Sequence, residues 1–354
     1  MRHAAFAVPG ALTTPTGGYA YDRRIIAELC TLGWSIDVID LGSEFPRPSD
    51  AARLAAHARL AALSRDHPIV VDGLAFGALP DVAAALAPSH RLFALVHHPL
   101  AREIGLSREE SETLRISEQK ALAAARRVIV TSATTAGMIV SDYGVPPDRV
   151  AVVRPGCDRR PDDLQETDTS RADSPVRLLA VGAMVPRKGY DVLIAALAPL
   201  RHLSWRLTIV GDLTRAPETV SRVKADIARF DLHDRVILAG AVPDERLAAL
   251  FADSDLFALA SRFEGYGMAF AEAIAHGLPI VATEGGAITE TIPATARILV
   301  ETDDVAALSA ALRRLIEDPE ERRHLAAGAR RAAAELPSWR QSAVLFGTVL
   351  ETAR

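Results

Sequence analysis

Short, almost continuously apolar runs alternate along the chain with longer segments in which apolar residues recur every three or four positions. The short runs predict buried β-strands, and the longer segments predict amphipathic helices. In the first half, strands are expected at residues 3–8, 35–40, 68–71, 91–96, 127–131 and 150–153, with helices at 21–32, 50–65 and 109–126. Strands without polar alternation are buried on both faces, so this pattern predicts a parallel sheet between two layers of helices.

A polar stretch, residues 158–175, interrupts the alternation and contains one leucine and no other large apolar residue. Because such a composition cannot bury a core, the stretch is expected to link two domains. Beyond it, strands are expected at 176–181, 205–210, 235–238, 256–260 and 279–282, with helices at 190–200, 218–230, 244–251, 268–276 and 319–335. The chain is therefore predicted to be an α/β protein with two doubly wound domains, residues 1–165 and 172–337, facing each other across a cleft. A last helix at 338–354 is expected to pack back on the first domain.

The composition is that of a globular protein. Of the 354 residues, 49% are hydrophobic and 24% are charged, which excludes a disordered or collagen-like chain. The net charge of −5 argues against general nucleic-acid binding. Cys30 and Cys157 lie outside any metal-binding spacing, so we expect two buried free thiols in a cytoplasmic protein. Pro9 and Gly10 break the first apolar stretch, which predicts a strand rather than a signal peptide, and no run reaches the ~18 apolar residues that span a bilayer.

The strongest candidate site is the segment Ser-Arg-Phe-Glu-Gly-Tyr-Gly-Met-Ala-Phe-Ala-Glu, residues 261–272, which follows a predicted strand and leads into a helix. Gly265 and Gly267 allow backbone N–H groups to approach a ligand where the helix dipole favours negative charge. Glu264 and Glu272 can accept hydrogen bonds from hydroxyl groups, so the segment suits a sugar nucleotide. Two alternatives are a purely structural glycine turn and a dinucleotide fingerprint, but the third glycine of that fingerprint is Phe270 here.

A second candidate is the basic turn Pro186-Arg187-Lys188-Gly189, which follows the strand at 176–181. Adjacent cations at the carboxyl end of a strand would neutralise a diphosphate. By itself the turn could equally be a solvated basic loop. Its position relative to the two glutamates of the 261–272 segment favours the binding role.

These residues together resemble the retaining glycosyltransferases of family four. The resemblance rests on Glu264-x7-Glu272, the Pro-Arg-Lys-Gly turn and a Gly17-Gly18 loop, and it extends to the turns at 210–212 and 240–244 and to the C-terminal helix. It implies the GT-B fold of two Rossmann-like domains. It also implies that Arg187 and Lys188 hold the donor diphosphate, with Glu272 on the ribose and Glu264 on a donor-sugar hydroxyl. The other donor-binding positions that it implies are Gly17, Gly18, Gly211, Val242, Gly265, Tyr266, Gly267 and Met268.

The resemblance further implies a catalytic histidine at the end of the strand 91–96. Both His97 and His98 match, and His97 is favoured. Asp72 and His98 are expected to contact the acceptor. Two positions depart from the family pattern: Ala183 stands where many relatives carry arginine, and Tyr266 where they often carry phenylalanine.

The implied reaction is transfer with retention at the anomeric carbon, in which preset cations stabilise the leaving nucleoside diphosphate. Neither a metal ion nor a cofactor is expected, and the donor substrate would be a UDP- or GDP-sugar. Asp253-Ser-Asp255 has the form of a metal-binding D-x-D, but it precedes the strand 256–260 at the end away from the cleft and is expected to be a turn.

The acceptor is expected to be a small molecule, a saccharide or a carrier-linked group. The helix at 50–65 carries arginines beside leucines and could touch a membrane surface, but an ordinary surface helix is favoured. Two other classes of function share the predicted architecture. A sugar-nucleotide epimerase would turn over the donor without an acceptor, and a non-catalytic nucleotide-binding protein would show no turnover. An NAD-dependent dehydrogenase is disfavoured because the first strand–turn–helix has no glycine-rich fingerprint.

Overall fold

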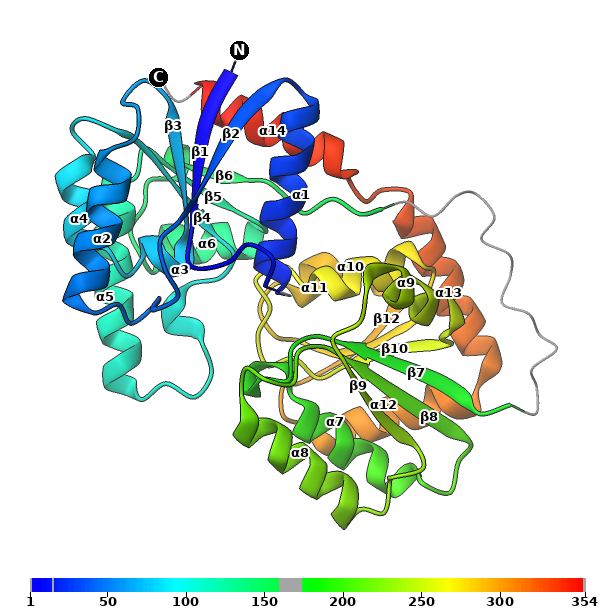
Figure 1. The fold of residues 1–354 in the computed structure, drawn as a ribbon. Coiled ribbons are helices and arrows are strands. Elements are labelled where there is room, and N and C mark those ends of the chain that lie inside the picture. Colours follow the sequence, from blue (N-terminus) through cyan, green and yellow to red (C-terminus); the bar gives the residue numbers. More distant parts are fainter. Residues whose placement is uncertain (1, 15, 159–173, 353–354) are drawn as a thin grey trace. The chain divides into compact units, whose positions relative to one another are not determined.

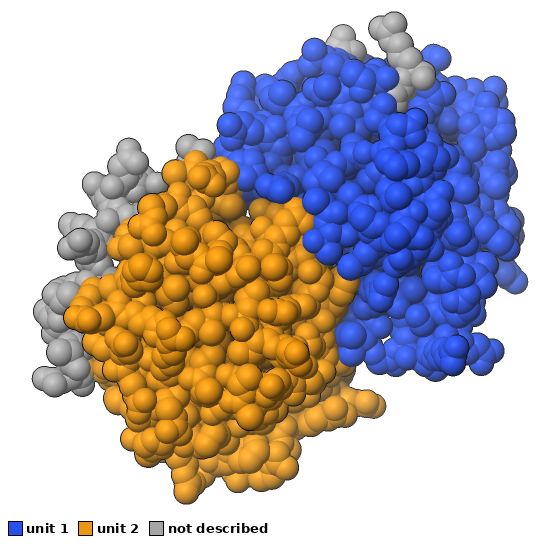
Figure 2. All heavy atoms as spheres, turned by 180° about the vertical axis from the view of Figure 1, so that it is seen from behind, with its two compact units in different colours: residues 1–156, 337–354 blue, residues 157–336 orange. Residues whose placement is uncertain are grey.

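The computed structural model describes residues 2–14, 16–158 and 174–352, and the chain divides into two compact units (Figure 2). Unit 1 comprises residues 1–156 and 337–354, and unit 2 comprises residues 157–336. Most of the predicted linker, and the predicted domain boundary between residues 165 and 172, lie outside the described residues. No described helix is long and apolar enough to cross a membrane.

Unit 1 is built on a parallel sheet of six strands in the order β2-β1-β3-β4-β5-β6. The strands are β1 (Arg2–Val8), β2 (Trp34–Asp40), β3 (Pro68–Asp72), β4 (Arg91–Val96), β5 (Arg127–Val130) and β6 (Val150–Val152). The helices are α1 (Gly17–Thr31), α2 (Asp50–Ala61), α3 (Gly73–Phe76), α4 (Pro80–Leu86), α5 (Arg108–Ala124), α6 (Ala133–Ser141) and α14 (Trp339–Thr352), with single 3₁₀ turns at Leu100–Arg102 and Pro147–Arg149.

Helices cover both faces of this sheet (Figure 1). Residues of alternate positions in β1 and β3, such as Ala7 and Val71, pack against the apolar sides of α2, α4, α5 and α6. On the other face α14 packs along α1, and Phe346 stacks on Phe6 with ring centroids 5.5 Å apart. Because the central strands β3, β4 and β5 bury both faces, they read in the sequence as continuous apolar runs, whereas the edge strand β2 is half exposed and alternates apolar with polar residues.

Unit 2 repeats the architecture with the strand order β12-β11-β10-β7-β8-β9, again all parallel. The strands are β7 (Val176–Val181), β8 (Trp205–Val210), β9 (Val236–Gly240), β10 (Leu256–Leu259), β11 (Ile280–Thr283) and β12 (Arg297–Val300). The helices are α7 (Tyr190–Leu197), α8 (Pro217–Arg229), α9 (Asp244–Asp253), α10 (Met268–Ala275), α11 (Ile288–Thr291), α12 (Val305–Glu317) and α13 (Pro319–Ala333), with 3₁₀ turns at Pro186–Lys188, Ala198–Leu200 and Ala294–Ala296.

Both sheets have a topological switch point, where the chain runs outward in opposite directions from two neighbouring strands. In unit 1 the neighbours are β1 and β3, and in unit 2 they are β7 and β10. Open parallel sheets bind ligands beside the carboxyl ends of the strands at such a point. The loops that follow these strands are therefore where each unit's functional residues should be sought.

The prediction of two doubly wound α/β domains is confirmed. Two local expectations were wrong. Gly17 and Gly18 form the first turn of α1 rather than a loop before it. Cys30 is exposed and Cys157 alone of the two thiols is buried, because Cys30 is not among the residues that α1 buries.

Candidate functional site

The basic turn of unit 2 lies at the switch point and is held against the end of β10. Gly189 has a φ of +63°, and a Cβ at this position would lie 2.0 Å from the carbonyl oxygen of Ala260, so glycine alone lets the turn approach that strand. The backbone N–H of Arg262 donates to the carbonyl of Arg187 over 2.8 Å. The Arg262 guanidinium also donates to the Pro186 carbonyl over 2.7 Å. The turn is therefore fixed beside the segment that carries the first glutamate.

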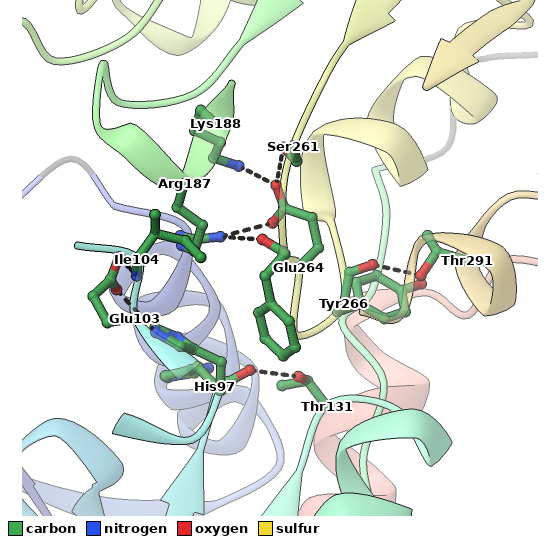
Figure 3. A network of polar contacts seen from close by, with 12 residues as sticks. His97, Glu103, Ile104, Thr131, Arg187, Lys188, Ser261, Glu264, Tyr266 and Thr291 are labelled. Atoms are coloured by element: carbon green, nitrogen blue, oxygen red, sulfur yellow. Dashed lines mark hydrogen bonds and ion pairs between the residues drawn. The ribbon is translucent and has the colours of Figure 1, made fainter. Parts of the chain in front are cut away.

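Glu264 is buried at the centre of a network of donors in unit 2 (Figure 3). Lys188 Nζ donates to Glu264 Oε1 over 2.7 Å, and Ser261 Oγ donates to the same oxygen over 2.6 Å. The Nη1 atom of Arg187 donates to Glu264 Oε2 over 3.3 Å. Burial alone would raise the pKa of Glu264, but Lys188 and Arg187 outweigh it and hold that pKa at about 2. Glu264 is therefore a carboxylate at neutral pH and can accept hydrogen bonds but not supply a proton.

The glycine turn that follows Glu264 is also fixed by backbone contacts. The Glu264 carbonyl accepts a hydrogen bond from Ala287 N over 2.8 Å, and the Thr291 hydroxyl donates to the Tyr266 carbonyl. Gly267, with a φ of +92°, is the N-cap of α10. Met268 begins that helix, so its backbone and the preceding turn present N–H groups at the positive end of the helix dipole.

Gly17 and Gly18 lie in α1 of unit 1, and the remaining predicted donor residues lie in unit 2, after its strands or in α10. Gly211 follows β8, and a Cβ there would meet the Gly182 carbonyl at 2.0 Å, so this glycine is required for packing the turn after β8 against the turn after β7. Val242 follows β9 and is partly buried against the core of unit 2. Glu272 lies within α10, half-buried. The strand carboxyl ends thus bring together Gly182, the basic turn, Glu264 and the start of α10.

In unit 1, His97 lies at the end of β4 between two buried carboxylates. Its Nε2 atom is 3.1 Å from Asp22 Oδ1 and 3.5 Å from Asp72 Oδ2. Burial alone would lower the pKa of His97, but Asp22 and Asp72 raise it to about 10. At neutral pH the ring is therefore an imidazolium. Gly18 packs against it, since a Cβ on Gly18 would lie 3.0 Å from His97 Cδ2.

The two adjacent histidines differ sharply in their surroundings. His98 Nε2 lies 3.1 Å from Glu103 Oε2, and the Glu103 side chain is 42% exposed. His97 is enclosed by fully and almost fully buried acids, and its carbonyl oxygen is 3.5 Å from the Thr131 hydroxyl (Figure 3). The structure therefore gives His97 the specialised environment and His98 an ordinary surface pairing. The choice of His97 over His98 as the catalytic histidine stays a prediction.

Sequence reasoning missed three residues of these groups: Asp22, Ser261 and Arg262. Asp22 lies one helical turn after Gly18, so it shares the face of α1 that meets His97. That spacing was the one available signal. Ser261 and Arg262 belong to the motif segment but were assigned no role.

One described group of side chains could hold a metal ion, namely Asp22, Asp72 and His97, whose ligand atoms all lie within 4.8 Å of one another. A metal needs an unprotonated imidazole nitrogen. Here His97 Nε2, the nitrogen that faces both acids, carries a proton at neutral pH, because Asp22 and Asp72 raise the pKa of His97 to about 10. A protonated nitrogen cannot bind a metal ion. The D-x-D sequence lies elsewhere: Asp255 accepts two hydrogen bonds from the Arg177 side chain, at 2.9 and 3.1 Å, before β10.

Comparisons with known proteins agree with this architecture. Residues 163–332 match the family model described as Glycosyl transferases group 1, and residues 17–160 match the one described as Glycosyltransferase Family 4. The chain is 32% identical over 325 residues to an MMP alpha-(1->4)-mannosyltransferase of Mycolicibacterium hassiacum, covering 87% of this chain and 76% of that protein. It is 33% identical over 241 residues to a D-inositol 3-phosphate glycosyltransferase of Xylanimonas cellulosilytica, covering 64% of this chain but only 57% of that protein.

Solved structures show the same fold. Sucrose-phosphate synthase from Thermosynechococcus elongatus gives a TM-score of 0.83 at 21% identity, covering 99% of this chain and 98% of that one. HepE from Anabaena, in complex with UDP and glucose, gives a TM-score of 0.80 at 19% identity, covering 99% of this chain and 100% of that one. At these identities the likeness shows the GT-B fold of two Rossmann-like domains.

Proposed function

The chain belongs to the group 1 glycosyl transferases of glycosyltransferase family 4, and from that premise we propose that it moves a hexose from a UDP- or GDP-sugar to a hydroxyl acceptor with retention of configuration. The observation that carries the donor half of this proposal is the Arg187–Lys188–Glu264 network beside the start of α10. Two cations and a set of helix-end N–H groups form a site for a diphosphate.

In this proposal the diphosphate and Glu264 exchange partners. Glu264 neutralises Lys188 and Arg187 while the donor is absent. A diphosphate that binds these cations releases the carboxylate, which then accepts a hydrogen bond from a hydroxyl of the donor sugar. Glu272 accepts from the ribose. Arg187 supplies the charge that many relatives place at the position of Ala183.

Chemically, the bond between the anomeric carbon and the diphosphate oxygen breaks, and the acceptor oxygen bonds to the same carbon on the same face. The acceptor hydroxyl loses its proton to the leaving phosphate, so no carboxylate nucleophile is used. In this scheme Glu264 accepts a hydrogen bond from a donor-sugar hydroxyl and does not attack the anomeric carbon. The positive charges that stabilise the leaving group come from side chains, and we propose that no metal ion is needed.

His97 is proposed as the catalytic histidine of unit 1, with Asp72 and His98 near the acceptor. The acceptor is proposed to be a small molecule, a saccharide or a carrier-linked group. The names of the curated relatives describe a mannosyltransferase and an inositol-phosphate glycosyltransferase, and they support a hydroxyl acceptor without fixing its identity.

The first test is a thermal-shift panel with UDP, GDP, ADP and NAD. A ligand at 100 times its Kd adds about 2.7 kcal/mol of stability, which is a shift of a few degrees. We expect UDP or GDP to stabilise the parent chain and to lose this effect in Lys188→Ala, while the exposed control Lys224→Ala behaves as the parent does. Stabilisation by NAD alone would overturn the donor assignment.

The second test follows the donor. Conversion of the sugar nucleotide without any acceptor would identify an epimerase, which is the alternative function of this architecture. Where transfer occurs, the anomeric coupling constant of the product, measured by NMR, reports retention or inversion. Unchanged transfer in the presence of EDTA is expected for a metal-independent enzyme.

A further inference from the structure

Asp22 is the one residue of the His97 cluster for which neither the motifs nor the proposed reaction has a use. Its side chain is completely buried and comes from α1, whereas His97 follows β4. Asp22 Oδ1 lies 3.1 Å from His97 Nε2, and the second oxygen, Oδ2, has no hydrogen-bond partner among the described residues. A buried carboxylate with an unsatisfied oxygen costs stability. We therefore explain the buried Asp22 carboxylate by its effect on the charge and orientation of His97, and not by a contribution to folding stability.

Asp22 and Asp72 contact the same imidazole nitrogen but are held in different ways. Asp72 is fixed by its own role as the N-cap of α3, since Oδ1 accepts from Leu74 N over 2.7 Å, which leaves Oδ2 to face the ring. Asp22 makes the closer contact with Nε2. With Nε2 turned to both acids, the ring's Nδ1 is the atom left for a substrate, and it has no partner among the described residues. The His97 side chain is 20% exposed, so Nδ1 can be reached.

From this geometry we propose that Asp22 is a positioning residue, which keeps a proton on Nε2 of His97 and fixes the ring so that Nδ1–H is presented as a hydrogen-bond donor to the substrates. This inference rests on the proposed role of His97 in transfer. In this role His97 donates a hydrogen bond from a fixed orientation, and it does not act as a general base.

The charges around the pair agree with this assignment. Burial raises the pKa of Asp22 to about 6 despite the attraction of His97, and the pKa of His97 is raised to about 10. Each group favours the charged form of the other, because a carboxylate and an imidazolium attract each other at 3.1 Å. The other groups that face the pair are Asp72 from β3, Arg23 from α1, which favours the ionised form of Asp22, and the Tyr21 ring, which meets the imidazole edge-on with centroids 5.4 Å apart. Tyr21 stays neutral, since burial raises its pKa far above the ordinary value.

The decisive measurement is the titration of His97 by NMR in the full chain labelled with ¹⁵N-histidine, with the signal assigned by its loss in His97→Gln. We expect the ring to remain an imidazolium up to about pH 10. Asp22→Asn should lower that pKa by about 1 to 3 pH units, and the exposed control Asp37→Asn should leave it in place. An imidazole that titrates near pH 6.5 in the parent chain overturns the proposal without any variant being needed.

A kinetic measurement distinguishes positioning from a merely structural role. Asp22→Asn should lower kcat on the order of 10- to 100-fold, the usual cost of removing the partner that orients a functional histidine, with nucleoside diphosphate affinity unchanged because Arg187 and Lys188 belong to unit 2. Parent-like kcat in Asp22→Asn overturns the proposal. Failure of the parent chain to bind any nucleoside diphosphate would instead refute the proposed function and leave the imidazole titration to decide this inference.

Discussion

Replacing Glu264 with glutamine should destabilise unit 2, because it leaves Lys188 and Arg187 in a buried site without their counter-charge. The magnitude follows from the pKa of Glu264, which is lowered from 4.5 to about 2. At 1.36 kcal/mol per pH unit this drop corresponds to about 3 kcal/mol of favourable interaction with the ionised carboxylate. Because the folded-state pKa is depressed, the contribution is complete above pH 4.5 and is lost as the pH falls towards 2.

The assay is urea denaturation at pH 7 and at pH 3, followed by circular dichroism. Glu264→Gln should unfold at lower urea than the parent at pH 7, and the difference should shrink at pH 3. The exposed control Glu245→Gln should match the parent at both values. Equal stability of Glu264→Gln and the parent at pH 7 would refute the reasoning, since the two cations would then not depend on this carboxylate.

The same variant tests whether diphosphate and carboxylate exchange partners. UDP or GDP without a sugar should bind Glu264→Gln more tightly than the parent, since the ligand no longer competes with the carboxylate. Recovering about half of the 3 kcal/mol on binding would tighten Kd about tenfold, measured by calorimetry. Sugar transfer should nevertheless fall, because a neutral amide oxygen replaces the charged carboxylate that accepts the hydrogen bond of the sugar hydroxyl. Weaker binding of the nucleoside diphosphate would contradict the exchange.

Two further predictions concern unit 1. Gly18→Ala should lower transfer about tenfold or more, because a Cβ there would press on the imidazole at 3.0 Å. The exposed control Gly137→Ala, whose Cβ would meet nothing within 4 Å, should behave as the parent in the same kinetic assay. The free energy of unfolding should fall as the pH rises from 4.5 through about 8, because burial raises the pKa of Glu118 to about 8 and its ionisation inside the fold is unfavourable. Urea midpoints measured at pH 5, 7 and 9 should decline less in Glu118→Gln than in the parent. An equal decline in both proteins would contradict the assignment.

The fold was predictable because its signal is local. Strands buried along their whole length, such as β3, β10 and β11, must be apolar runs, and eleven of the twelve strands, β1 through β11, were predicted. The exception is β12, a four-residue edge strand whose residues are all only partly buried. The helices α3, α4, α6, α11 and α12 were also not predicted.

The candidate motifs could also be recognised from neighbouring residues in the sequence, whereas the distant residues that contact them could not. The sequence by itself determined that a glycine turn with Glu264 follows one strand, that Arg187 and Lys188 follow another, and that histidines follow a third. It did not determine that Lys188 donates to Glu264, nor that Asp22 meets His97 across 75 positions of the chain. Parallel strands bring their carboxyl ends together only through the order in which they pair, and that order is settled by packing between distant segments. Elements therefore follow from periodicity along the chain, but the charges that surround the His97 imidazole and the Glu264 carboxylate follow from the tertiary structure alone.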